Sequence, residues 1–118
     1  MKKGEIGRKG EEAAEEHLKE KGFRVLKRNY KNKYAEIDMV AKKGEETVFV
    51  EVRSTSTEYF GTPEETVNQR KIEKLKKNVL AYTTFENVEG PFRIDLICVS
   101  FNRKGELEEI KHYENITN

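Results

Sequence analysis

The consecutive segments AEIDMVA (residues 35–41), KKGEE and TVFVEVR (47–53) decide the expected fold. Two apolar segments around a turn-like sequence are typical of a β-hairpin, here with a longer loop. Side chains alternate between the two faces of a strand, so every second residue of the later segment shares a face. That face carries Val48, Val50 and Val52, and we expect it to be packed.

The other face of the hairpin carries charged residues. Glu51 and Arg53 share it, and a hairpin folded about the middle of the turn places Asp38 opposite Glu51. Directly opposed residues have Cβ atoms about 4.5–5.5 Å apart, where like charges are destabilising. A divalent cation resolves this conflict, and Mg²⁺ or Mn²⁺ prefers such oxygen ligands. The hairpin therefore predicts a metal site, with Arg53 placed to hold a phosphate or stabilise its developing charge.

A structural interpretation of the same residues remains open. Glu51 and Arg53 would form an ion pair on a solvated face of the sheet, with Asp38 as a second partner. Such pairs are common and contribute little to stability. The weakness of this interpretation is the position of the residues, because a wholly polar face seldom lies on the central hairpin of a small core.

Helices are expected before and after the hairpin. Apolar and small residues recur at helical spacing over residues 5–21, which predicts the first helix. Thr62 as N-cap, Pro63 at the first helical position and Glu65 as the capping-box acid predict a second helix over 63–82.

Three more strands are expected, over residues 23–27, 92–101 and, more weakly, 107–113. The resulting order is α-β-β-β-α-β-β. This order predicts an α/β fold in which helices flank one mixed sheet.

The composition indicates a single small domain. The chain has 118 residues, of which 35% are hydrophobic and 38% charged. No apolar run approaches the roughly 18 residues of a membrane span, and no apolar signal segment follows the basic start. We therefore expect a cytoplasmic protein with no membrane partner. Cys98 is the single cysteine, so we expect it to be a buried hydrophobic residue outside any disulfide.

The charges are unevenly distributed along the chain. Residues 1–33 contain eleven Lys and Arg against six Glu. A second basic cluster occupies the predicted second helix, where Gln69 and Lys71 could reach a substrate and Lys74 and Lys77 could contact phosphates. Basic clusters suggest a polyanionic partner, but charged runs on helices are equally typical of solvated faces.

The two aspartates and one glutamate stand out among the acids. The chain has twenty Glu but only two Asp, Asp38 and Asp95, and both aspartates lie in apolar strand-like segments. Glu11 shares a helical stripe with Ala14 and Leu18, so it is expected to face the sheet. The alternative is that Glu11 only stabilises the N-terminal half of the helix through the helix dipole.

Several short motifs occur together along the chain. They are G-x-x-G-E-x-x-A from Gly7 to Ala14, Arg28-Asn29-Tyr30, Glu36-Ile37-Asp38, Phe49-Val50-Glu51-Val52-Arg53, Phe60-Gly61-x-Pro63, Lys71 and Arg93-Ile94-Asp95. Together they resemble the YraN-like (UPF0102) family over about residues 4–100. That family in turn is similar to the restriction-endonuclease-like PD-(D/E)xK nucleases, and to the archaeal Holliday junction resolvases in particular.

The resemblance implies a restriction-endonuclease-like fold, with residues 1–118 as a single nuclease-like domain. It implies that Asp38 and Glu51 are metal-binding acids, that Glu11 is the acid from the first helix, and that Val52 offers its backbone carbonyl to the metal. Arg53 stands where the nuclease signature has Lys. Arginine keeps the positive charge but cannot act as a base, so Lys71 is an alternative source of an amine.

Three hypotheses follow. The first is an endonuclease that uses Mg²⁺ or Mn²⁺ to activate water against phosphodiesters of DNA, including branched or structured DNA. In it Asp38, Glu51 and Arg53 are catalytic, and Glu11 is a further metal ligand. The alternative is a non-catalytic nucleic-acid-binding module on the same fold. A third is a plain interaction domain with structural ion pairs. The resemblance also favours a homodimer.

Overall fold

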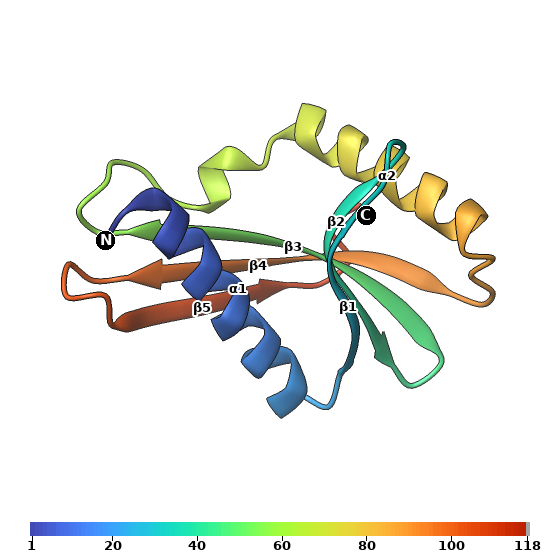
Figure 1. Ribbon diagram of the computed structural model, residues 1–118, viewed down its shortest axis with the longest axis horizontal. Coiled ribbons are helices and arrows are strands. Elements are labelled where there is room, and N and C mark those ends of the chain that lie inside the picture. Colours follow the sequence, from blue (N-terminus) through green and yellow to red (C-terminus); the bar gives the residue numbers. More distant parts are fainter. Residues whose placement is uncertain (118) are drawn as a thin grey trace.

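The computed structural model describes residues 1–117 and contains one five-stranded sheet with two long helices (Figure 1). The expected element order and mixed α/β fold are confirmed. The elements are α1 (Lys3–Glu20), β1 (Arg24–Lys31), β2 (Glu36–Lys43), β3 (Glu46–Ser56), the short 3₁₀ helix η1 (Glu64–Thr66), α2 (Gln69–Phe85), β4 (Phe92–Phe101) and β5 (Leu107–Tyr113).

The strands lie side by side in their chain order, from β1 to β5. Neighbouring strands are antiparallel except β3 and β4, which are parallel. Parallel strands need a crossover connection, and α2 lies in that connection. The sheet is therefore mixed, and its one parallel pair joins the second strand of the predicted hairpin to β4.

The two helices cover opposite faces of the sheet. Ala14 and Leu18 of α1 pack in one cluster with Val50 of β3, whereas Val79 of α2 packs in another cluster with Phe49. The predicted valine face is confirmed, since Val48 and Val50 are buried and Val52 packs partly buried against the same cluster. The neighbouring Phe49 is buried as well, so the first half of β3 is enclosed on both faces.

The hairpin register agrees with the prediction, although its loop does not. The ladder pairs Met39 with Val50 and continues to Lys43 with Glu46. The turn is therefore tight, and Gly44 adopts a φ of +58° that suits glycine. The prediction of a longer loop was wrong. The predicted register is nevertheless correct, because the predicted and the observed turn have the same centre.

The second helix begins later than expected. Residues 64–66 form only the 3₁₀ helix η1, and Val67 is extended. The α-helix begins at Gln69, where the side chain of Asn68 accepts a hydrogen bond from the backbone N–H of Lys71 at 2.9 Å. The prediction of a continuous helix was therefore wrong over residues 63–68, because Asn68 caps the helix in place of Thr62.

The other boundaries differ slightly from the expectations. The first helix is shifted by one or two residues, to Lys3–Glu20, and β1 extends to Lys31 because it pairs with β2 along its length. Cys98 is buried, as expected. In the part of the chain that the structure describes, no helix is long and apolar enough to cross a membrane.

A glycine lets α1 lie close to β3. A Cβ atom built on Gly10 would lie 1.7 Å from Oγ and 2.7 Å from Cβ of Ser54, whereas one built on Gly7 would meet no atom within 4 Å. Only a residue without a side chain permits this approach at position 10. The contact fixes the distance of the following residue, Glu11, from the second half of β3.

Candidate active site

Asp38 lies just beyond the end of the paired region between β2 and β3. The regular pairing ends at Met39 and Val50, and beyond it Asp38 Oδ2 accepts a hydrogen bond from the backbone N–H of Val52 at 2.8 Å. Burial raises the pKa of Asp38 to about 7, and the charge of Glu51 adds to the effect. The bond from Val52 acts in the opposite direction. The expected conflict between two neighbouring acids is therefore present.

Two cations converge on Glu51, which is only 8% exposed. Arg53 Nη2 lies 2.8 Å from Glu51 Oε2, and Lys71 Nζ lies 3.5 Å from the same oxygen. A buried carboxylate needs such partners, because its desolvation is otherwise costly. Arg53 follows Glu51 on β3, but Lys71 comes from the first turn of α2. The crossover helix thus brings a primary amine to the acids.

These side chains line a cavity of about 320 Å³ that lies between elements far apart in the sequence. The cavity is lined by both acids and cations. Its lining residues are Glu11 from α1, Glu36 and Asp38 from β2, Glu51, Val52 and Arg53 from β3, and Lys71, Lys74, Leu75 and Asn78 from α2.

Glu11 reaches the cavity but stays apart from the two central acids. Its carboxylate lies 4.0 Å from Arg28 Nη2, and its charge contributes to the raised pKa of Asp38. Within residues 1–117, no group of three or more His, Cys, Asp or Glu side chains is placed to hold a metal ion. The expected metal ligands Glu11, Asp38 and Glu51 therefore share a cavity without forming a three-acid cluster.

Asp38 and Glu51 nevertheless suit a hard divalent cation. Mg²⁺ is commonly bound by one or two carboxylates and keeps several waters. A cation between these acids would also relieve the repulsion that raises the pKa of Asp38. Val52 lines the same cavity. That its backbone carbonyl binds the metal stays a prediction.

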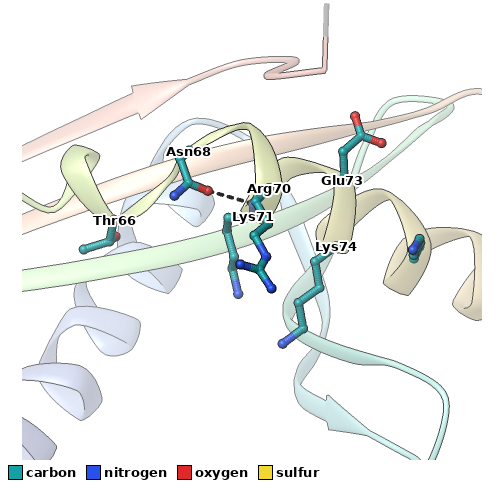
Figure 2. A pocket seen from close by; sticks show the side chains of 7 residues that line it. Thr66, Asn68, Arg70, Lys71, Glu73 and Lys74 are labelled. Carbon is teal, nitrogen blue, oxygen red and sulfur yellow. Dashed lines mark hydrogen bonds between the residues drawn. The ribbon is translucent and has the colours of Figure 1, made fainter.

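A basic cavity of about 470 Å³ adjoins the first one along α2. Lys71 and Lys74 line both cavities, and Arg70 and Lys77 line the basic one. Figure 2 shows Arg70, Lys71 and Lys74 extending from the same side of the helix, while Glu73 points away from them. The acids and the cations therefore form one continuous surface.

The residues predicted on the second helix differ in whether they line the two cavities. Lys71, Lys74 and Lys77 lie along the two cavities. Gln69 lines neither, and its side-chain amide donates a hydrogen bond to Glu73 at 3.0 Å. Asn78 was missed, although it lies seven residues after Lys71 and so shares its helix face.

Comparisons with known proteins find similar sequences over most of the chain. Residues 10–99 match the model of the family described as "Uncharacterised protein family UPF0102". A UPF0102 protein of Carboxydothermus hydrogenoformans is 40% identical over 98% of both chains. Similar proteins from Desulforamulus reducens and Pelotomaculum thermopropionicum are 41% and 38% identical, covering 93% of this chain and 93% and 92% of their own. The chain belongs to the UPF0102 family.

Proposed function

We propose that the protein is a metal-dependent endonuclease that hydrolyses phosphodiester bonds of DNA, with branched or otherwise structured DNA as the substrate class. One observation carries the proposal: the neighbouring acids Asp38 and Glu51 lie in a cavity where Arg53 and Lys71 converge on Glu51. Two acids with two cations can hold a divalent ion and a phosphate at the same place. The homodimer expected from the family resemblance stays a prediction.

Asp38 and Glu51 would hold Mg²⁺ or Mn²⁺ in this proposal. When bound, the ion supplies Lewis-acid activation of water and of the scissile phosphate. The hydrogen bond from Val52 fixes the orientation of the Asp38 carboxylate before any ion arrives. Glu11 and Glu36 add negative charge to the same cavity and favour the binding of a cation.

Arg53 would hold the phosphate. Its Nη2 is engaged by Glu51, but its Nε is buried and has no hydrogen-bond partner among residues 1–117. The Arg53 side chain is 30% exposed, so its terminal Nη groups, and not the enclosed Nε, would meet a phosphate oxygen in the cavity. Guanidinium groups bind phosphates with a planar set of donors.

Lys71 would supply the amine that Arg53 lacks. Arginine remains protonated at any physiological pH and cannot accept a proton, whereas a lysine amine can change its charge. Lys71 Nζ lies 3.5 Å from Glu51 Oε2, beside the proposed metal. Arg53 in place of the signature lysine on β3 is thus compatible with activity if α2 provides the amine through Lys71.

The test is the cleavage of labelled single-stranded, duplex, flap and four-way-junction DNA in Mg²⁺ and Mn²⁺. Wild type, Asp38→Ala and Glu12→Ala are purified identically. Glu12→Ala is the matched control, because Glu12 is an exposed acid on α1 that pairs with Arg8 outside the cavity. We expect cleavage by the wild type and Glu12→Ala alone. Equal cleavage by all three proteins, or none on any substrate, would contradict the proposal.

A non-catalytic DNA-binding module is the second candidate function. It is favoured by the absence of a three-acid metal cluster in residues 1–117 and by the basic cavity that extends along α2. Fluorescence anisotropy with labelled DNA distinguishes the two functions. DNA binding that falls steeply with salt, is indifferent to Mg²⁺ and leads to no cleavage would favour the module.

A further inference from the structure

Phe60 is a fully exposed aromatic side chain in the loop between β3 and η1. An exposed apolar residue has no functional meaning by itself. Its surroundings are what matter here, because Phe60 belongs to the wall of a third cavity, of about 300 Å³. That cavity is also lined by Lys3 of α1 and by Arg53.

The third cavity continues the candidate active site. Glu11, Val52 and Arg53 line both, so Arg53 stands at their junction. A strand of nucleic acid whose phosphate is held by Arg53 can pass from the acids into this cavity. Its next nucleotide would then lie between Lys3 and Phe60.

The loop that carries Phe60 is anchored by the preceding residue, Tyr59. Tyr59 Oη donates a hydrogen bond to the carbonyl oxygen of Met1 at 2.9 Å, and Lys3 Nζ lies 5.3 Å from the centre of the Tyr59 ring. Tyr59 is therefore tied to the start of α1. The following residue, Gly61, has a φ of +94°, a conformation that favours glycine.

Cations beside an exposed aromatic ring match the chemistry of single-stranded nucleic acid. The cations bind the backbone, and the ring stacks on a base. The bases of an intact duplex are stacked on each other and do not offer this face. We propose that Phe60 stacks on an unpaired base next to the phosphate held by Arg53, so that the site selects DNA with unpaired nucleotides. This inference rests on the proposed function for its choice of DNA.

The absence of tryptophan from the chain permits a direct test. Phe60→Trp introduces a single tryptophan, whose fluorescence is quenched by a stacked base. Phe85→Trp is the matched control, because Phe85 is also exposed but lies at the end of α2 and lines none of the three cavities. Both variants are titrated in EDTA with oligo(dT), a flap and a blunt duplex.

We expect oligo(dT) and the flap to quench the tryptophan at position 60 at least twofold, and to leave the one at position 85 nearly unchanged. In fluorescence anisotropy, Phe60→Ala should weaken the binding of oligo(dT) and of the flap by at least fivefold, and that of the duplex by less than twofold. Phe60→Tyr should restore the binding of oligo(dT) and the flap. Circular dichroism should show the same unfolding midpoint for all variants, because the ring is exposed.

Three results would overturn the inference. If the DNAs bind Phe60→Ala as tightly as wild type and leave the position 60 fluorescence unchanged, stacking fails while the proposed nuclease stands. Equal quenching by the duplex would remove the preference for unpaired bases. If no DNA binds the wild type, the proposed function and this inference fail together.

Discussion

Asp38 and Asp95 are the two aspartates of the chain, and the same sheet gives them opposite environments. Asp95 is fully buried and accepts hydrogen bonds from Arg93, from His112 at 2.8 Å and from the backbone N–H of Asn115 at 2.9 Å. Asp38 has the single backbone bond from Val52 and another acid beside it. A saturated carboxylate supports the fold, whereas an unsaturated one beside a cavity is available to a ligand.

The pKa values express the same contrast. Burial opposes the charge of Asp95, but the bonds from His112 and Arg93 outweigh it, so the pKa of Asp95 is lowered. Burial and the charge of Glu51 instead raise the pKa of Asp38 to about 7. Asp95 is therefore expected to stabilise the fold as an anion, and Asp38 to destabilise it.

The largest expected effect is that of Asp95→Asn. This variant should lower the free energy of unfolding by about 3–5 kcal/mol, because Arg93 would keep its charge and lose its buried partner. Urea denaturation followed by circular dichroism measures the loss. Asp38→Asn is the matched variant, and an equal loss in both would erase the distinction between the two aspartates.

Gly10→Ala tests whether α1 must lie close to β3 at Ser54. Its methyl group would overlap Ser54, so we expect a loss of about 1–3 kcal/mol in the free energy of unfolding. Gly7→Ala, with open space around it, should be neutral or stabilising by about 0.5–1 kcal/mol. Thermal unfolding compares the two, and an equal response at both positions would contradict the close contact.

Asp38→Asn should raise the free energy of unfolding by about 1–2 kcal/mol at pH 8, because the amide removes a buried charge and still accepts from Val52. The sign follows from the raised pKa. In wild type, the contribution of Asp38 to the free energy of unfolding is fully present below a pH of about 3.8, the pKa of this group in the unfolded chain. This contribution is lost as the pH rises to about 7. The difference between the proteins should therefore vanish near pH 4. A difference that is constant with pH would contradict this origin.

The smallest effect concerns His17, whose ring nitrogen lies 3.1 Å from His112, itself bonded to Asp95. Burial and the charges of His112 and Lys21 lower the pKa of His17. Stability should therefore fall as pH decreases below about 6.5, where the unfolded chain binds the proton more readily. His17→Gln should reduce this fall in urea denaturation between pH 7 and 5. The same slope in both proteins would assign the fall to another group.

The sequence could predict what depends on local patterns. The alternation of β3 and the symmetry of the turn predicted the register that brings Asp38 near Glu51. Helical spacing predicted both long helices, but Asn68 competed successfully with Thr62 as the cap. A local pattern contains no information on which of two competing caps the tertiary structure favours.

Contacts between distant elements could not be predicted in this way. The convergence of Lys71 on Glu51 requires the crossover by α2, and the partners of Asp95 include His112 on β5 and Asn115 beyond it. The structural role of Asp95 depends on residues that follow it by 17 and 20 positions, which no local pattern predicts. Asp38, in contrast, is distinguished in the sequence by its place in the hairpin opposite Glu51.

The central claim is that Asp38 and Glu51 bind a divalent ion. Titration calorimetry with Mn²⁺ on wild type, Asp38→Asn and Glu12→Gln tests it most directly. We expect one ion to bind per chain in wild type and Glu12→Gln, and binding to weaken by at least tenfold in Asp38→Asn. Binding that is absent from wild type, or unchanged in Asp38→Asn, would contradict the account.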